Sequence, residues 1–195
     1  MVQKRWGTGV PSCMKLHIGC GKKALEGWIN IDIKDHPWID LKHNILQPLP
    51  YDKNTIDYIF NEHVFEHFTQ REGMKILRDW HRVLSLTGVI RIAMPGLKDS
   101  IAKYLDGSWR NEPWVKKLKF RRRTDAEYLN LLFYGTLDRY HHKCIYDFEL
   151  LKRNLERAGF RNVQQQVHHQ SSYIELCNIE GRSAAESNLI IEAVK

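Results

Sequence analysis

A short alternating run, Met14–Ile18, leads directly into the glycine loop Gly19-Cys20-Gly21. Alternation of this kind is typical of a half-buried strand, and glycine after it allows a sharp turn and a close approach of backbone to a ligand. A second alternating run, Trp28–Ile33, follows shortly and carries Asp32 near its end. We therefore expect two strands whose ends present a glycine loop and an acid, at the edge where open α/β sheets bind ligands.

The rest of the chain continues to alternate between strand-like and helix-like patterns. Apolar residues recur at helical spacing before Thr87-Gly88, and a second helix has Asp147 at its start and Gly159 at its end. This order predicts an α/β protein with a mainly parallel sheet. Further strands are expected at 55–60, 89–94, 163–167 and 189–194, and helices at about 74–84 and 147–159.

Composition limits the possible partners and locations. With 30 Lys and Arg against 23 Asp and Glu the net charge is +7, which favours anionic partners such as nucleic acid, nucleotides or phosphorylated sugars. The sequence has no secretory signal and no apolar run of membrane-spanning length, so we expect no membrane association. Four scattered cysteines without a CxxC pair suggest neither a structural zinc site nor a disulfide framework, which indicates a reducing, cytoplasmic location.

A leader and one domain with an insertion are predicted. Residues 1–13 are interpreted as a flexible leader, and 14–195 as a single domain. Between about 100 and 142 the periodic pattern degrades, and this stretch is interpreted as a partly helical insertion that forms a lid.

A dinucleotide-binding loop is the first alternative to consider. Gly19–Ala24 fits the G-x-G-x-x-A pattern, which requires a following helix and an acid about 20 residues later. Asp32 comes too soon after Gly19 for that helix to form. Nicotinamide and flavin binding are therefore disfavoured.

Several segments, taken in order, resemble the successive motifs of class I S-adenosylmethionine-dependent methyltransferases. The likeness is greatest to a small, methyltransferase-type-11-like branch with a GCG loop followed by a GW-x-N-x-D strand. The segments that carry it are Lys15–Gly21, Gly27–Asp32, Pro48–Pro50, Ile56–His67, Leu84–Pro95, Ala158–Phe160 and Asn188–Val194.

The resemblance implies a Rossmann-like fold with a seven-stranded sheet, an antiparallel last strand and helices on both faces. It also implies S-adenosylmethionine as cofactor and S-adenosylhomocysteine as product. Gly19 and Gly21 would pass the methionine part, Asp32 would bind the ribose, and Asn44 stands where relatives often carry an acid near the adenine. Two departures are Lys23 in place of a third glycine and a missing helix between the first two strands. The full set implied to bind cofactor is His17, Gly19, Cys20, Gly21, Asp32, Asn44, Ile45, Asn61 and His63.

Histidines supply candidate bases. Asp138-Arg-Tyr-His-His142 closes the insertion, and histidine is a common base for removing a hydroxyl proton. We expect His142, or less favourably His141, to take the proton with Asp138 orienting it, and His63 to face the cofactor sulfonium. The alternative is that these polar residues only cap a helix or lie in solvent.

His63-Val-Phe-Glu-His67 matches the H-x-x-E-H zinc-peptidase motif. That motif should lie well inside a helix, whereas here it follows a strand directly and opens a helix. The competing interpretation is that Val64 and Phe65 pack, Glu66 favours a helix N-terminus and His67 is solvated. No bound metal is expected.

The acceptor is the open question. The basic run from Lys116 to Arg123 is either a solvated face or a site for a phosphate-bearing substrate or RNA. Trp109, Arg139, Tyr140 and His141 are the candidate acceptor-binding residues, since aromatic rings can stack on a base or a sugar.

The preferred function is O-methylation of a sugar in a glycan or nucleotide-sugar. A small-metabolite or RNA methyltransferase is the alternative, with nucleic acid possible but not favoured. An inactive binding module with the same fold is the alternative of another class, and the intact Gly19, Gly21 and Asp32 set argues against it. The oligomeric state does not follow from the sequence.

Overall fold

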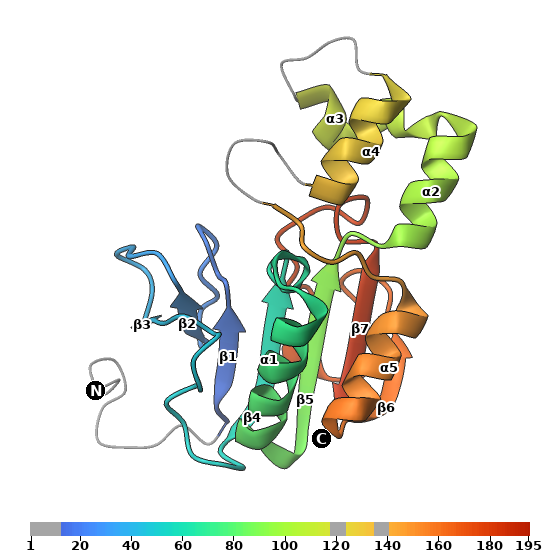
Figure 1. The fold of residues 1–195 in the computed structure, drawn as a ribbon. Coiled ribbons are helices and arrows are strands. Elements are labelled where there is room, and N and C mark those ends of the chain that lie inside the picture. Colours follow the sequence, from blue (N-terminus) through green and yellow to red (C-terminus); the bar gives the residue numbers. More distant parts are fainter. Residues whose placement is uncertain (1–12, 118–123, 135–140) are drawn as a thin grey trace.

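The computed structural model describes residues 13–117, 124–134 and 141–195, and its strands form one seven-stranded sheet in the order β3-β2-β1-β4-β5-β7-β6 (Figure 1). Strands β1 to β5 pair in parallel, while β7 runs antiparallel to both β5 and β6. This confirms the expected mainly parallel sheet with an antiparallel last strand. The strands are β1 (Lys15–Ile18), β2 (Ile29–Asp32), β3 (Leu41–Lys42), β4 (Ile56–Glu62), β5 (Leu84–Met94), β6 (Arg161–Gln165) and β7 (Leu189–Val194).

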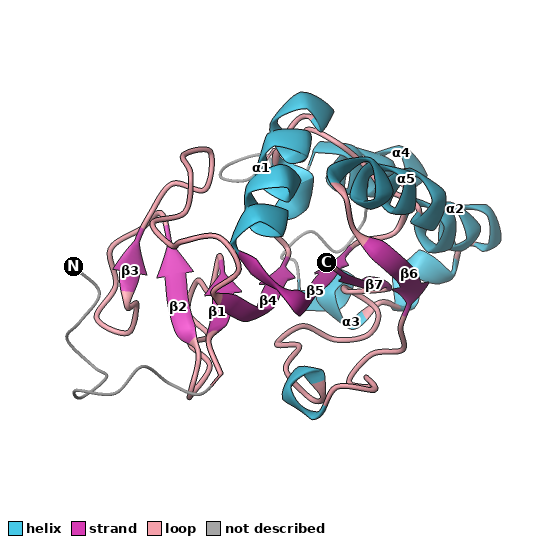
Figure 2. Cartoon of the chain, turned by 90° about the horizontal axis from the view of Figure 1, so that it is seen from below, coloured by secondary structure: helices cyan, strands magenta, loops and turns pink. Residues whose placement is uncertain are grey.

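Two helices cover one face of the sheet. They are α1 (Gln70–Val83) and α5 (Phe148–Ala158), which lie side by side on the same side of the strands in Figure 2. Their apolar stripes and alternate strand residues form the main core, in which Trp80 of α1 and Leu155 of α5 are fully buried. This core contains most of the buried apolar residues in the described part of the chain, and their removal from water stabilises the fold.

Both helices begin where their sequence provides a cap. Thr69 and Glu72 make a capping box at the start of α1, and the Asp147 side chain accepts from the Leu150 N–H at the start of α5. Gly159 ends α5 in the left-handed conformation. The predicted boundaries of this helix are therefore confirmed.

The other face of the sheet has a different cover. The resemblance implied helices on both faces, whereas this face is packed by the irregular segment 166–188, which contains the short 3-10 turn η3 (Ile174–Leu176). A buried ion cluster holds the segment down: Arg91 of β5 bonds to Glu180 of the segment and to Glu192 of β7, each at 2.5 Å. The crossovers from β1 to β3 are too short to contain helices.

A helical lid stands beyond the carboxyl ends of the strands (Figure 1). Its described helices are α2 (Leu97–Asp106), α3 (Pro113–Lys117) and α4 (Asp125–Tyr134), with the 3-10 turn η2 (Ser108–Asn111) between the first two. The two ends of the lid meet, because Gly96 and Tyr146 form a β-bridge and the Leu97 N–H donates to the Tyr146 carbonyl at 2.9 Å.

Other expectations differ in detail. β6 begins two residues earlier than the predicted run 163–167. Val163 is its only buried side chain, so no alternation of apolar and polar residues marks where this strand starts. β3 has only two residues and was not expected from its own pattern. The proposed leader, apart from Cys13, lies outside the described residues. None of the helices in the described ranges is long and apolar enough to cross a membrane.

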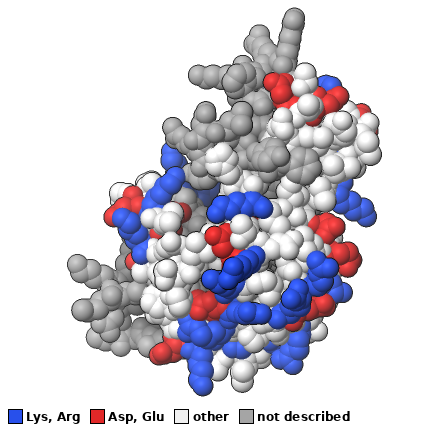
Figure 3. All heavy atoms as spheres, viewed as in Figure 1, with Lys and Arg blue, Asp and Glu red and all other residues white. Residues whose placement is uncertain are grey.

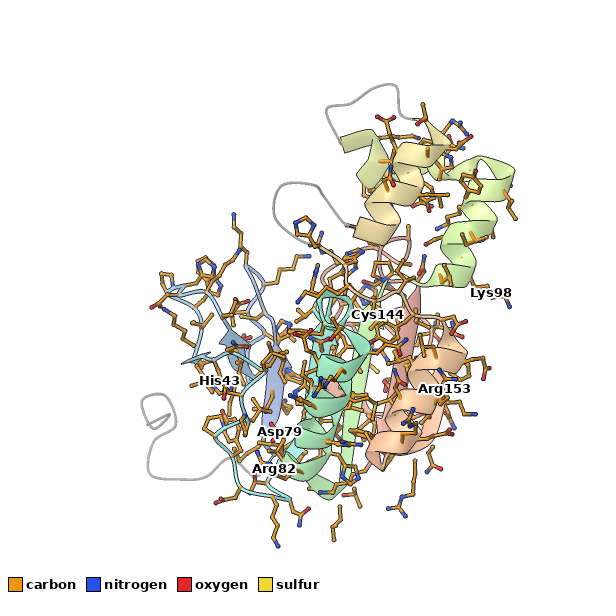
Figure 4. The ribbon with its side chains drawn as sticks, viewed as in Figure 1. His43, Asp79, Arg82, Lys98, Cys144 and Arg153 are labelled. Carbon is orange, nitrogen blue, oxygen red and sulfur yellow. The ribbon has the colours of Figure 1, made fainter. Side chains whose placement is uncertain are left out.

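Surface charge is mixed on the face that α1 and α5 form. Figure 3 shows Lys and Arg side chains gathered over this face with Asp and Glu between them. Two of the charged side chains on this face also bond to the backbone. Asp79 of α1 accepts from the Leu49 N–H at 2.7 Å, and Arg82 donates to the Leu49 and Tyr51 carbonyls (Figure 4). They tie the loop before β4 to α1.

Candidate functional site

A cavity of about 1530 Å³ lies at the carboxyl ends of β1, β2 and β4, below the lid. Its volume leaves room for a nucleoside-sized ligand and a second small molecule. The cofactor-side lining includes His17, Gly19, Cys20, Gly21, Asp32, Asn44 and Ile45; the lid-side lining includes Lys103, Trp114, Tyr128, His142 and Arg182.

Both glycines of the loop have a backbone conformation that favours glycine, but only one of them is closely packed. Gly19 has φ +73°, and a Cβ there would lie 2.1 Å from Val64 Cγ2. Gly21 has φ +53°, but a Cβ on it would meet nothing within 4 Å. Gly19 is therefore required by packing against the turn after β4, whereas Gly21 leaves open space beside the cavity.

Asp32 is held in place at the end of β2. One carboxylate oxygen accepts from the Gly21 N–H and the other from the Lys34 N–H, both at 2.9 Å. Each oxygen keeps a further lone pair, so the carboxylate has acceptors left for a diol. Since Asp32 also lines the cavity, the residues present fit an adenosyl ribose.

Most of the other predicted cofactor residues also line the cavity: His17, Cys20, Asn44, Ile45 and His63. Asn61 does not line it. Its side chain is fully buried and donates to the Ile18 carbonyl at 3.0 Å, so it ties β4 to β1. Glu62, the next residue, does line the cavity, and its carboxylate accepts from the Gly181 N–H at 2.8 Å.

Burial changes the proton affinities of two groups in the glycine-loop region. It lowers the pKa of His17 to about 4, although the ring's hydrogen bond with Asn30 opposes this. It raises the pKa of Cys20 to about 11, so this thiol is not a thiolate nucleophile at neutral pH.

The H-x-x-E-H residues converge at the end of the cavity below the lid. His63 follows β4 with φ +53°, a conformation that a residue with a side chain rarely adopts. Residues Phe65–His67 form a separate 3-10 turn, η1, rather than the first turn of α1. The motif therefore opens a short helix directly after β4, as expected, but this helix is η1, and α1 begins only after the Thr69 cap.

Glu66 is buried, with 3% of its surface exposed, which contradicts the interpretation that it only favours a helix N-terminus. Its Oε1 lies 3.4 Å from His63 Nδ1, and no described residue donates a hydrogen bond to either of its oxygens. Burial raises the pKa of Glu66 to about 8, and burial together with Arg182 lowers that of His63 to about 3.

Backbone contacts bring His142 to the same place. The Lys143 and Cys144 N–H groups donate to the Glu66 carbonyl at 2.9 and 3.2 Å, and His67 Nδ1 donates to the His141 carbonyl at 3.1 Å. The rings of His67 and His142 are 5.1 Å apart. Figure 4 shows Cys144 near the upper end of α1, just below the lid.

The lid contributes different residues from those expected. Trp109 is 1% exposed, stacks on Tyr128 and donates to Asp125, so it forms the core of the lid and does not line the cavity. Trp114 and Tyr128 line it instead. His141 is exposed and takes part through its backbone carbonyl. Asp138, Arg139 and Tyr140, and the part of the basic run from 118 to 123, lie outside the described residues.

Comparison with known proteins agrees with this geometry. A family model described as "Methyltransferase domain" matches residues 22–92. No curated protein sequence matches the chain.

Similar solved structures include two SAM-dependent methyltransferases. One, from Thermotoga maritima and described as a possible histamine N-methyltransferase, has a TM-score of 0.55 and 14% identity, over 95% of this chain and 84% of that one. The other, from Archaeoglobus fulgidus, has a TM-score of 0.54 and 18% identity, over 94% and 87%.

Human N-acetylserotonin methyltransferase in complex with SAM is also similar, with a TM-score of 0.53 and 13% identity, over 93% of this chain and 47% of that one. At these identities the solved structures establish the fold, which is the class I fold implied by the resemblance. The family model covers residues 22–92 of the 195 and describes a methyltransferase domain. Together with this fold it indicates an S-adenosylmethionine-dependent methyltransferase.

Proposed function

We propose that this methyltransferase transfers its methyl group to a hydroxyl oxygen of a small, polar, sugar-like acceptor, free or in a glycan or nucleotide-sugar. The observation that carries the proposal is the continuity of the cavity. One side is lined by the glycine loop and Asp32, and the other by the histidines after β4 and the aromatic residues of the lid.

The cofactor side has the groups that an adenosyl ligand needs. Asp32 would accept from the ribose hydroxyls, Asn44 and Ile45 would lie beside the adenine, and the open space at Gly21 would admit the methionine part. When bound, S-adenosylmethionine supplies an electrophilic methyl group on a sulfonium. The protein has to bring the acceptor oxygen into line with that methyl and help its proton to leave.

The acceptor side has features that suit a sugar. Trp114 lines the cavity, is only partly buried and offers an aromatic surface for a sugar ring. Tyr128 is 2% exposed and stacks between Trp109 and Trp114, so it supports the Trp114 ring from behind. Lys103 and Arg182 line the cavity as well, but Lys103 pairs with Asp99 and Glu112 and Arg182 pairs with Glu186, so these cations favour a polar rather than a strongly anionic acceptor. The imidazoles of His63, His67 and His142 line the same cavity, which supports a histidine base, and His142 is the proposed base.

Calorimetric titration with S-adenosylhomocysteine and S-adenosylmethionine tests the cofactor side. We expect micromolar binding by the metal-stripped protein and a loss of at least tenfold in affinity in Asp32→Asn. Asp35→Asn is the matched control, because that side chain is 78% exposed and pairs only with Lys42 at 3.4 Å. Equal affinities in the wild type and Asp32→Asn would contradict the assignment of the ribose site.

Methyl transfer to a panel of acceptors tests the other side. Sugars, sugar phosphates and nucleotide-sugars are expected to accept a radiolabelled methyl group, whereas amines and short RNA are not. His142→Ala is expected to lose turnover by 10²-fold or more while keeping its affinity for S-adenosylhomocysteine. Turnover only with amines or RNA would overturn the proposed acceptor class.

A further inference from the structure

The polar end of the cavity contains a buried carboxylate without a donor. Both oxygens of Glu66 lack a hydrogen-bond partner, although only 3% of the residue is exposed. A buried carboxylate left in this way is costly, and most buried polar groups in folded proteins are paired. His63 Nδ1 lies 3.4 Å from Oε1, and a cation beside Glu66 would supply the close partner that both oxygens lack among the described residues.

Two histidines lie where a cation could satisfy this carboxylate. One ligand atom from each of Glu66, His67 and His142 can be chosen so that all three lie within 4.8 Å of one another. Atoms that share a first-row metal ion at about 2.0–2.2 Å lie within roughly 4 Å of one another, so a small adjustment of rotamers brings these three onto one ion.

One ring nitrogen of His67 is held by the backbone. Its Nδ1–H donates to the His141 carbonyl at 3.1 Å, which fixes the tautomer and places the lone pair on Nε2. A backbone carbonyl that holds the other ring nitrogen is the usual outer-shell partner of a metal-bound histidine. The N–H groups of Lys143 and Cys144, which donate to the Glu66 carbonyl, fix the chain that carries His142 against the same turn.

We propose that Glu66, His67 and His142 bind a divalent cation of the zinc or manganese type at the acceptor end of the cavity. Two imidazoles and one carboxylate suit such an ion and leave coordination positions open on the cavity side, since His67 and His142 both line the cavity. From the sequence alone we expected no bound metal. The burial of Glu66 and the position of His142 depend on the fold, so the sequence could not predict this site.

This inference rests on the proposed function only for the role of the ion. There, an open position would hold the acceptor's hydroxyl oxygen and lower the pKa of that hydroxyl, so that its proton would leave to water in the cavity. In that case His142 would act as a ligand in place of the base role given to it above. A sugar, which offers neighbouring hydroxyls, suits two open positions. Metal binding itself does not depend on which acceptor the enzyme uses.

A second group of metal-binding residues supplies the control. His168, His169 and Glu180 also lie within reach of one ion, but the Glu180 carboxylate is already used by Arg91 and His169. We therefore expect little binding there. Variants of this group separate binding in the cavity from adventitious binding by surface histidines.

The experiment measures metal binding directly. Chelator-treated full-length protein is titrated with Zn²⁺ and with Mn²⁺ by calorimetry, and with Co²⁺ while its visible d–d absorption is followed. We expect one ion per chain, at least tenfold weaker binding in Glu66→Gln and in His142→Ala, and wild-type binding in His168→Ala. Glu66→Gln keeps the shape of the side chain, and circular dichroism checks that it folds.

Each outcome decides between the two proposals. Unchanged binding in Glu66→Gln and His142→Ala, or loss in His168→Ala alone, would overturn the cavity site. No metal binding together with normal binding of S-adenosylhomocysteine would also overturn it and would leave His142 as the base of the proposed function. Metal binding that depends on Glu66 in a protein that does not bind S-adenosylhomocysteine would support the site and contradict the proposed function.

Discussion

At the scale of single residues, the burial of His17 makes stability depend on pH. Its pKa is about 4 in the folded protein and about 6.5 in the unfolded chain, because burial disfavours the charged ring. The unfolded chain therefore binds more protons between these values, and stability falls as the pH drops from 6.5 to 4. The loss approaches about 1.4 kcal/mol per pH unit within this window.

Replacing the ring tests this. His17→Phe keeps the stacking on Phe60, whose centroid is 5.2 Å away, and Asn30 Oδ1 still accepts from the Leu25 N–H. Denaturant unfolding at pH 7, 5.5 and 4.5 is expected to show a smaller acid loss for this variant than for the wild type. His43→Asn, at a partly exposed histidine whose ring contacts the Gln47 carbonyl, is the control. Parallel acid losses in the wild type and His17→Phe would exclude His17 as the cause.

The two glycines of the loop make a matched pair. Gly19→Ala places a methyl 2.1 Å from Val64 Cγ2 in addition to the cost of its positive φ. Gly21→Ala has only the cost of the left-handed conformation, about 1–2 kcal/mol. Thermal unfolding is therefore expected to rank the wild type above Gly21→Ala and Gly21→Ala above Gly19→Ala. Equal stability of the two variants would show that Val64 yields without cost.

At the scale of elements, the buried ion cluster fixes the segment 166–188 to the sheet. Arg91 is fully buried, bonds to Glu180 and Glu192, and also donates to the Val167 and Gln170 carbonyls. Arg91→Met leaves two buried carboxylates without their cation. We expect a loss of about 3–5 kcal/mol in the free energy of unfolding, because removing one partner of a buried pair leaves a charge uncompensated.

Urea unfolding and limited proteolysis measure this loss, and cleavage within 166–188 is expected to increase. The variant Arg91→Met with Glu180→Gln and Glu192→Gln removes the stranded charges and should recover part of the stability. A triple variant that is as unstable as Arg91→Met would show that the loss comes from packing and not from charge.

Local pattern explains which elements could be predicted. The strands at 15–18 and 29–32 follow alternating runs, those at 56–62 and 189–194 lie in short runs rich in apolar residues, and α5 follows its Asp147 cap and final Gly159. The segment 166–188 could not be predicted, because Arg91, Glu180 and Glu192 are far apart in sequence and meet only in the fold. A contact of that kind has no periodic signature.

In the candidate site, too, some residues could be predicted from local pattern and others could not. Gly19, Gly21 and Asp32 could be predicted because their spacing lies within one strand–loop–strand unit. Glu66 was misinterpreted, because its burial depends on the fold, in which the chain after the lid bonds to its carbonyl. Trp109 was predicted to bind the acceptor, but the packing of the lid turns Trp109 inward, and Trp114 lines the cavity instead.

At the scale of the whole molecule, the cavity joins two parts that the chain builds separately. The sheet supports the glycine loop and Asp32, whereas the lid has a small core of its own around Trp109, Val115 and Tyr128. The ends of the lid are tied together through Gly96 and Tyr146. Substitutions inside the lid are therefore expected to alter the binding of the acceptor and to leave the binding of the cofactor unchanged.

Trp114→Ala tests this separation, because Trp114 lines the cavity from the lid and lies far in sequence from the glycine loop. We expect a KM for the acceptor raised tenfold or more, from the loss of about 1–3 kcal/mol of stacking, with the affinity for S-adenosylhomocysteine unchanged. Leu105→Ala, at a lid side chain that is 77% exposed, is the control and should leave both constants unchanged. Steady-state kinetics and calorimetry on the same preparations provide the two measurements. A parallel fall in both affinities would mean that the lid and the sheet form one binding unit, since the cofactor would then sense a change made only on the acceptor side.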